Sequence, residues 1–233
     1  HRNGMISVKI SGKLYGNAPE TLPRIGVVMN IDKRFKNVKW LGLGPHESYI
    51  DSCSSVKFDL WERKIEDMYT PYIFPQENGN RHNVKNFSLE DERNIRMYFE
   101  TLDEKFDFSI SEYTIENIEN AGHTYDLKKS DFLQLKIDME QYGLGSASCG
   151  EEVLEKYRLY CKDFEFSLSW KYDGQLIYQN QRIGYKISDS GALPDQSATI
   201  LTLPISSEQK QIVESMTQEE KMSLEMSDLK VNQ

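Results

Sequence analysis

The chain has 233 residues, a length typical of one domain or of one domain with an appendage. Its formal net charge of −9, without a run of Lys or Arg, argues against a nucleic-acid partner, and no stretch approaches the roughly 20 apolar residues that span a bilayer. Three cysteines without a Cys-x-x-Cys pair predict neither a disulfide framework nor a zinc site, so a reducing, cytoplasmic location is the simpler interpretation.

Short segments in which apolar and polar residues alternate recur along the chain, and each is typical of a half-buried strand. The segments are separated by Gly, Pro, Asn and Asp rather than by the helices of about 10 to 15 residues that parallel crossovers need. We therefore predict an all-β fold, a large antiparallel β-sandwich. The expected strands are 6–14, 25–31, 38–43, 56–65, 94–100, 106–110, 132–139 and a last one within 157–170.

One short helix is expected near Thr114 to Ala121. Thr114 is a good N-cap residue, and Ile115 and Ile118 fall three apart on one side of the helix. Gly122 is expected to take the left-handed conformation that commonly closes a helix.

The pattern changes after residue 170. Residues 171–174 are typical of a hairpin turn, and from Ser206 the spacing becomes helical and starts with a capping box. We predict a β-sandwich over 1–170 and a C-terminal extension over 171–233, a hairpin followed by a partly helical tail.

Residues 69–81 combine two prolines, three aromatic residues and a Gln-Glu-Asn-Gly turn, which no regular helix or strand could keep intact. Pro71 and Pro75 each remove a backbone donor, and Asn78-Gly79 suits the positive φ of a tight turn. The segment is predicted to be a shaped loop between strands.

This loop has two interpretations. Glu77 and Asn78 offer polar groups suited to sugar hydroxyls, and Tyr69, Tyr72 and Phe74 could stack on a pyranose ring. Alternatively, the aromatic residues pack on the sandwich while Glu77 and Asn78 satisfy the backbone of the loop.

No catalytic or metal site follows from the residues themselves. Glycoside hydrolysis needs two carboxylates held at a fixed separation, and nothing pairs any two of the acidic residues in or beside loops. The histidines lack metal-ligand spacing, and Cys149 lacks a nearby base to make it a nucleophile. The acidic residues are Glu47, Asp51, Glu77, Glu151 and Glu152, and the isolated histidines are His46, His82 and His123.

Five motifs, in this order and with compatible spacing, resemble the small-chain, C-terminal domain of lac-type β-galactosidases of glycoside hydrolase family 2. Five motifs together are far more specific than any one of them, and the resemblance runs from about Leu22 to Trp170. The motifs are Leu22-Pro-Arg-Ile-Gly26, the run Trp40 to Tyr49, the run Asp67 to Gly79, His123-Thr-Tyr-Asp-Leu127 and the run Gly143 to Gly150.

The resemblance implies a supersandwich of the galactose-mutarotase-like type that lies against a catalytic barrel and completes one side of its active-site opening. It also implies that the parent enzyme hydrolyses terminal non-reducing β-D-galactose residues, such as that of lactose, by a retaining route. The catalytic glutamates and the residues that bind Mg²⁺ and Na⁺ belong to upstream domains, so the isolated chain is expected to be inactive. The expected partners are those domains, the galactoside substrate and further copies of the enzyme.

The resemblance carries three substrate-site residues over to this chain. Some family members place a sugar-stacking Trp in the Gly-rich loop, where this chain has Cys149 or Gly150, and neither can form a stacking platform. The loop from Phe74 to Arg81 resembles one that borders the active-site mouth. Glu77 and Asn78 are therefore expected to contact the barrel or to control access to the site.

The chain departs from the family pattern in two ways, and two other functions remain open. The family domain normally begins well before Leu22, so we expect leading strands to be missing, with apolar surface and a sheet edge exposed in consequence. The residues after 170 match no motif of the family. The alternative function is a stand-alone carbohydrate-binding module, and a third is an assembly module without sugar contact.

Overall fold

The structure is a computed structural model, and it describes residues 4–101, 103, 105–145 and 152–173. The chain divides between Asp173 and Gly174 into two units. The hairpin and helical tail expected in 171–233 lie outside the described residues, except for 171–173, which belong to a strand. The proposed division of the chain after residue 170 remains a prediction.

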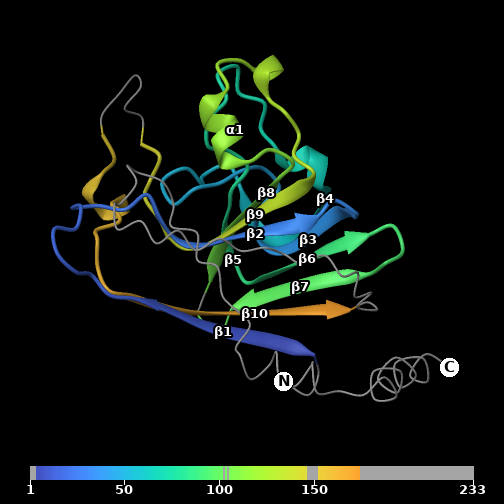
Figure 1. Cartoon of the computed structure of the whole chain (residues 1–233), viewed down its shortest axis with the longest axis horizontal. Helices are drawn as coiled ribbons and strands as arrows, with labels where there is room; N and C mark the ends of the chain where they lie inside the picture. Colours follow the sequence, from blue (N-terminus) through green and yellow to red (C-terminus); the bar gives the residue numbers. More distant parts are fainter. Residues whose placement is uncertain (1–3, 102, 104, 146–151, 174–233) are drawn as a thin grey trace, which may run out of the picture. The chain divides into compact units, whose positions relative to one another are not determined.

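The described residues form two antiparallel sheets that pack face to face, which confirms the predicted all-β sandwich (Figure 1). One sheet has the strand order β1-β10-β7-β6-β3-β4 and the other β2-β9-β8-β5. The strands are β1 Met5–Gly12, β2 Arg24–Asp32, β3 Phe35–Gly44, β4 Lys57–Lys64, β5 Arg81–Val84, β6 Asn86–Asp91, β7 Arg96–Thr101, β8 Phe106–Ser111, β9 Phe132–Gln141 and β10 Phe164–Asp173.

Helical structure is limited to four short segments in the described part of the chain: the 3₁₀ turns η1 (Ile65–Met68), η2 (Thr124–Asp126) and η3 (Glu155–Tyr157), and the helix α1 (Ile115–Asn120). The Thr114 side chain caps α1 by accepting from the Asn117 backbone N–H at 3.1 Å. The helix ends through the Ala121 N–H, which donates to the Ile118 carbonyl. The prediction for Gly122 is wrong, because the chain leaves the helix at Ala121 in extended backbone and does not need a left-handed residue there.

The main core lies between the two sheets. Trp40, Phe87 and Phe108 are essentially inaccessible to solvent. The Phe87 ring stacks on Phe99 at 4.6 Å and on Phe108 at 4.3 Å, measured between ring centroids, so side chains of both sheets meet in one packed cluster. Burial of large aromatic rings is a major source of stability in a domain of this size.

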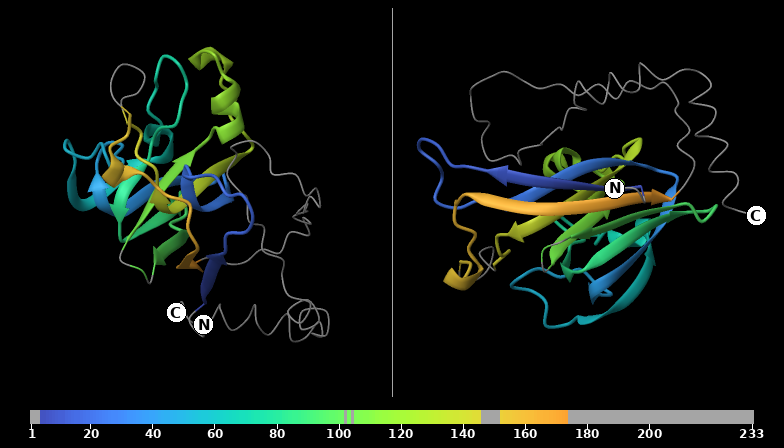
Figure 2. Two further views of the ribbon diagram at one scale, coloured as in Figure 1. Left: turned by 90° about the vertical axis from the view of Figure 1, so that its left-hand side faces the viewer. Right: turned by 90° about the horizontal axis from the view of Figure 1, so that it is seen from below.

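The two ends of the described chain pair with each other. β1 runs antiparallel to β10 from the Met5–Lys171 pair to the Gly12–Phe164 pair, and Figure 2 shows the two strands side by side at one edge of the larger sheet. β4 forms the opposite edge. The absence of leading strands remains a prediction that these pairings do not address.

The expected strands from 6–14 to 132–139 are present, while three details differ. β5 and β6 were not predicted as strands, although Phe87 and Leu89 alternate with polar residues along β6. The segment expected to be one strand from 157 to 170 becomes regular only at Phe164, since residues 155–157 form η3 and Tyr160 makes an isolated bridge to Thr21.

β8 and the central part of β9 are buried on both faces rather than on one. Their apolar residues face the core, and their polar residues contact the loop 69–80 and the segment around α1. For example, the side-chain oxygen of Gln134 accepts a hydrogen bond from the Ile115 N–H at 2.8 Å. This covered polar face positions the candidate site.

Candidate functional site

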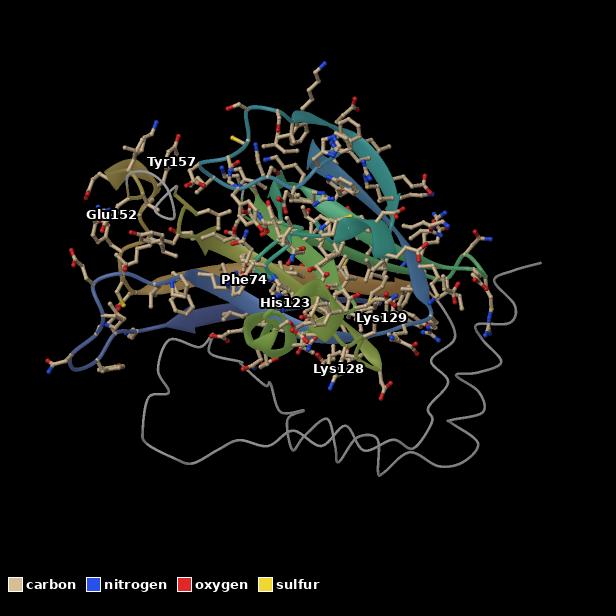
Figure 3. All side chains as sticks on the ribbon, turned by 90° about the horizontal axis from the view of Figure 1, so that it is seen from above. Phe74, His123, Lys128, Lys129, Glu152 and Tyr157 are labelled. Carbon is tan, nitrogen blue, oxygen red and sulfur yellow. The ribbon has the colours of Figure 1, made fainter. Side chains whose placement is uncertain are left out.

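The loop 69–80 and the segment that carries α1 rise side by side from one end of the sandwich (Figures 1 and 2). They touch where the Tyr69 ring meets the Tyr113 ring edge to face at 5.1 Å. Figure 3 views this end from above, with Phe74 and His123 labelled on it. At the tip of the loop, Ile73 is 90% and Phe74 66% exposed, so the loop presents two large apolar side chains to solvent.

The three aromatic residues of the loop do not form one stacking surface. Tyr69 packs on Tyr113, and the Tyr72 hydroxyl donates to the Glu47 carboxylate. That hydrogen bond is the main reason why the pKa of Tyr72 rises to about 12. Phe74 alone of the three is exposed, which weakens the interpretation of the loop as an aromatic sugar platform.

Asn78 points into the loop and holds its backbone. Its side-chain oxygen accepts from the Thr70 N–H at 3.1 Å, and its side-chain nitrogen donates to the Gln76 carbonyl at 2.8 Å. The expected positive φ occurs at Gly79, at 75°. A Cβ there would lie 2.8 Å from the Met68 carbonyl oxygen, so the turn requires glycine.

Glu77 is held by two cations from the smaller sheet. Its carboxylate accepts from Lys136 Nζ at 2.9 and 3.0 Å and from Arg24 Nη2 at 2.8 Å. Arg24 lies on β2 and Lys136 on β9, which are neighbouring strands. Of the two interpretations of the loop, the structure supports backbone stabilisation for Asn78, but Glu77 binds side chains of the sheet rather than the backbone of the loop.

The network continues below the loop through buried polar groups. Arg24 Nη1 donates to the Asp138 carboxylate at 2.9 Å, and Gln141 Nε2 donates to the same oxygen at 2.8 Å and to Asn80 at 3.1 Å. The formal charges of Arg24, Lys136, Glu77 and Asp138 cancel. This balance offsets part of the cost of burying the four groups, although burial still raises the pKa of the Asp138 carboxyl.

A second branch joins His82 to Asp107. His82 Nδ1 lies 2.9 Å from both carboxylate oxygens, and Asp107 also accepts from the Asn83 N–H at 3.0 Å and from Asn80 Nδ2 at 3.2 Å. No spacing in the sequence paired this histidine with an acid. The pair forms because β5 and β8 are neighbouring strands.

The network sets the charge of Glu77. Burial alone would raise the pKa of its carboxyl, but the charges of Lys136 and Arg24 outweigh burial and hold the pKa below its ordinary value of 4.5. Burial likewise opposes the charge of Arg24, yet Asp138 and Glu77 raise its pKa. Glu77 is therefore an ionised positioning group with its charge already compensated, unlike a general acid, whose pKa would be raised.

The remaining residues expected at a site are dispersed. Cys149, Gly150 and Glu151 lie outside the described residues. Glu152 lies 3.6 Å from Arg158 on the surface, and Asp51 accepts from the Gly145 N–H at 2.7 Å. Among the described residues, no group of three metal-ligating side chains could hold an ion, and no helix is long and apolar enough to cross a membrane.

The polar partners of Glu77 were not identified from the sequence. Lys136 and Asp138 occupy every second position of β9 and are 6% and 1% exposed. Their alternation with apolar residues looks the same as that of a solvated sheet face. The one signal for such partners in the sequence was Glu77 itself. It is the only glutamate of the run Asp67 to Gly79, and that run contains no cation to pair with it.

Comparison with known proteins identifies the family. The family described as "Beta galactosidase small chain" matches residues 1–170. The chain belongs to this family. The small-chain match starts before Leu22, where the first recognisable motif lies, so it includes β1.

Curated relatives carry the same name. A β-galactosidase of Kluyveromyces lactis is 32% identical over 170 residues, which are 72% of this chain and 16% of that protein. The β-galactosidase of Staphylococcus xylosus is 34% identical over 73% of this chain and 17% of its own length, and that of Actinobacillus pleuropneumoniae 30% identical over 73% and 16%. The small-chain domain therefore spans about one sixth of the curated relatives it matches.

Proposed function

We propose that this chain is the small-chain domain of a β-galactosidase that hydrolyses terminal non-reducing β-D-galactose residues of β-galactosides such as lactose. In this proposal the domain completes the rim of the active site and takes part in assembly, while the catalytic carboxylates come from the rest of the enzyme. The names of the relatives and the family match over residues 1–170 support the parent activity.

The observation that carries the rim role is the construction of the loop 69–81. Its base is fixed by Glu77 and Asn78, whereas Ile73 and Phe74 at its tip are exposed. A fixed base with an exposed apolar tip suits contact with another protein surface or with a sugar face, because little ordering entropy remains to be lost on binding. Glu77 and Asn78 then act by positioning the tip, and Cys149 would contact substrate from the Gly-rich loop.

Further features of the proposal concern the rest of the enzyme. We assign the catalytic barrel, the other upstream domains and the Mg²⁺ and Na⁺ ions to the remaining part of the enzyme. A retaining mechanism of glycoside hydrolase family 2, a homo-oligomeric state and a cytoplasmic location complete it. A stand-alone carbohydrate-binding module is less favoured, because Tyr69 and Tyr72 are occupied within the domain.

The test is hydrolysis of nitrophenyl-β-galactoside by the 233-residue chain, by the remaining part of a parent enzyme, and by the two mixed. We expect no turnover by the chain alone and a gain in activity on mixing. Enzyme-like turnover by the chain alone would overturn the assignment of catalysis to the other domains. Saturable binding of galactose by the chain alone would instead support the carbohydrate-binding module.

A further inference from the structure

A pocket is lined by the turn that follows β3, by Arg63 of β4, by η1 and the residues next to it, and by the start of β5. It has a cavity volume of about 280 Å³. Two of its lining residues are arginines, Arg63 on β4 and Arg81 at the start of β5. The rest of the lining consists of Pro45, His46, Glu47, Asp67, Met68 and Thr70.

Arg81 is a buried cation without a carboxylate partner. It is 2% exposed, and its guanidinium lies over the Trp40 ring at 5.3 Å. Nη1 donates to the Gly79 and Asn80 carbonyls at 2.9 and 3.2 Å, Nη2 lies 3.4 Å from the Met68 sulfur, and the buried Nε has no hydrogen-bond partner. Leaving a buried charged donor unsatisfied is costly, so natural structures seldom retain one without a reason.

Arg63 is a second arginine of the pocket that forms no ion pair among the described residues. It lies opposite the buried Val38 in the β3–β4 pairing, and is therefore on the core-facing side of its strand. Burial, followed by the charge of Arg63, lowers the pKa of Arg81 to about 10. In the part of the chain that the structure describes, the arginines that form ion pairs are Arg24, Arg34, Arg96 and Arg158.

The acidic residues of the pocket form no ion pair with either arginine. Glu47 is near enough to Arg81 to favour its charge, but one carboxylate oxygen accepts from the Tyr72 hydroxyl and the other from the Gly79 N–H at 2.8 Å. Asp67 is exposed to solvent at the rim. Arg81 therefore keeps one unused donor, Nε, while the charge of Glu47 still favours its protonated form.

We propose that this pocket is a receptor for a carboxylate group, which Arg81 and Arg63 bind together. A planar carboxylate matches the planar donor array of guanidinium, and two guanidiniums can share its two oxygens. The group can come from an acidic side chain in the remaining part of the enzyme or from a free organic acid. Binding to the chain itself does not depend on the proposed galactosidase activity.

The Trp40 ring provides the readout, because Arg81 lies over it. The 233-residue chain is labelled with 5-fluorotryptophan, and its three tryptophan resonances are assigned by single Trp→Phe variants. Sodium acetate is then titrated against sodium chloride at matched ionic strength, against neutral acetamide and against phosphate. We expect a saturable shift of the Trp40 resonance with acetate, a much weaker one with phosphate, and none with acetamide or chloride.

Two variants and one control link the shift to the pocket. Arg63→Gln should weaken acetate binding at least several-fold while the protein stays folded, because Arg63 is only half-buried. Arg81→Lys keeps the charge but loses the planar donor array, and should also weaken binding. Arg93→Gln, at an exposed position in the turn after β6, should leave the titration unchanged.

The source of the carboxylate is tested by adding the unlabelled remaining part of the enzyme to the labelled chain. The Trp40 resonance can shift to the frequency that it has in saturating acetate and no longer respond to added acetate. In that case an acidic side chain of the enzyme fills the pocket. A response that persists identifies a free acid as the ligand. Absence of a saturable acetate shift both before and after the addition, or an equal response to acetamide or a stronger one to phosphate, overturns the proposal.

Discussion

Glu77, at the base of an exposed loop, and Lys136, on an inner strand of the smaller sheet, form an ion pair in which both carboxylate oxygens contact Nζ, at 2.9 and 3.0 Å. Lys136 is 8% and Glu77 28% exposed at the side chain, so the pair is largely removed from solvent. Because Arg24 joins the same carboxylate, the loop is fixed to two strands at once. The position of the apolar tip therefore depends on charges beneath it.

Removal of one partner should destabilise the domain. Lys136→Met leaves Glu77 with Arg24 alone, and we expect a loss of about 2 kcal/mol, less than the full cost of a broken buried pair because Glu77 is partly exposed. The measurement is the midpoint and slope of urea unfolding. Lys128→Met, at an exposed position, is the matched control and should change stability by less than about 0.5 kcal/mol. Equal effects of the two changes would contradict the role of the pair.

Acid should weaken the same contact. The folded-state pKa of Glu77 lies below its ordinary value, so its contribution is fully present above about pH 4.5 and is lost as pH falls through the folded pKa. The stability difference between the unmodified chain and Glu77→Gln should therefore shrink below about pH 4.5. Urea unfolding of both proteins from pH 7 to pH 3 measures it. A stability difference that grows on acidification would contradict the lowered pKa of Glu77.

Substitution of two glycines separates the cost of a positive φ from the cost of a steric contact. Gly79→Ala forces a side chain into positive φ and against the Met68 carbonyl, so we expect a loss of about 2 kcal/mol. Gly16→Ala has a similar φ of 70° but meets no atom within 4 Å, and should cost about 1 kcal/mol. Thermal unfolding of the two variants is the measurement. A Gly79→Ala variant as stable as Gly16→Ala would show that the loop relaxes.

The tip of the loop should affect activity without affecting stability. Phe74→Ala removes an exposed ring, so we expect unfolding of the chain to be unchanged within about 0.5 kcal/mol, whereas KM or assembly of the reconstituted enzyme changes several-fold. The control is Tyr15→Ala, which removes a ring that is 84% exposed between β1 and β2. If both variants have the KM and the assembly of the unsubstituted enzyme, the loop is not part of the active-site rim.

An apolar strip on β4 makes a further prediction. Leu60 and Phe58 are 69% and 46% exposed and pair with Leu41 and Leu43 on the same face at a sheet edge. We expect the isolated chain to bind an environment-sensitive apolar dye or to self-associate, and Leu60→Ser to reduce either effect. Leu154→Ser, at an isolated position in the turn before η3 that is 55% exposed, is the control. A monodisperse chain without dye binding would contradict this expectation.

The sequence predicted most strands but not the polar network. Period-two alternation of apolar residues identified β8 and β9, because alternation directly reflects the pleat. It could not show that Asp107 and Lys136 on the opposite faces are also covered, since a solvated face and a covered polar face have the same pattern. β5 escaped prediction because Arg81 to Val84 is mostly polar and pairs across a register irregularity.

The loop itself was partly predictable. Its prolines and the Asn-Gly turn correctly indicated an irregular segment with positive φ, because these residues act on the local backbone. The partners of Glu77 lie 53 and 59 residues away along the chain, and no local rule reports such separations. The same limit applies to Arg81, whose burial depends on how β3, β4 and η1 meet around it.

The Arg24–Asp138 contact, which completes the Glu77 network, joins residues 114 positions apart. Closing so long a loop is entropically costly before any compensating contacts form, and proteins dominated by such contacts fold slowly. We therefore expect the charges beneath the loop to assemble only after β2 and β9 have paired. A substitution in this network should mainly speed unfolding and leave the refolding rate nearly unchanged, so the site lasts as long as the paired strands beneath it.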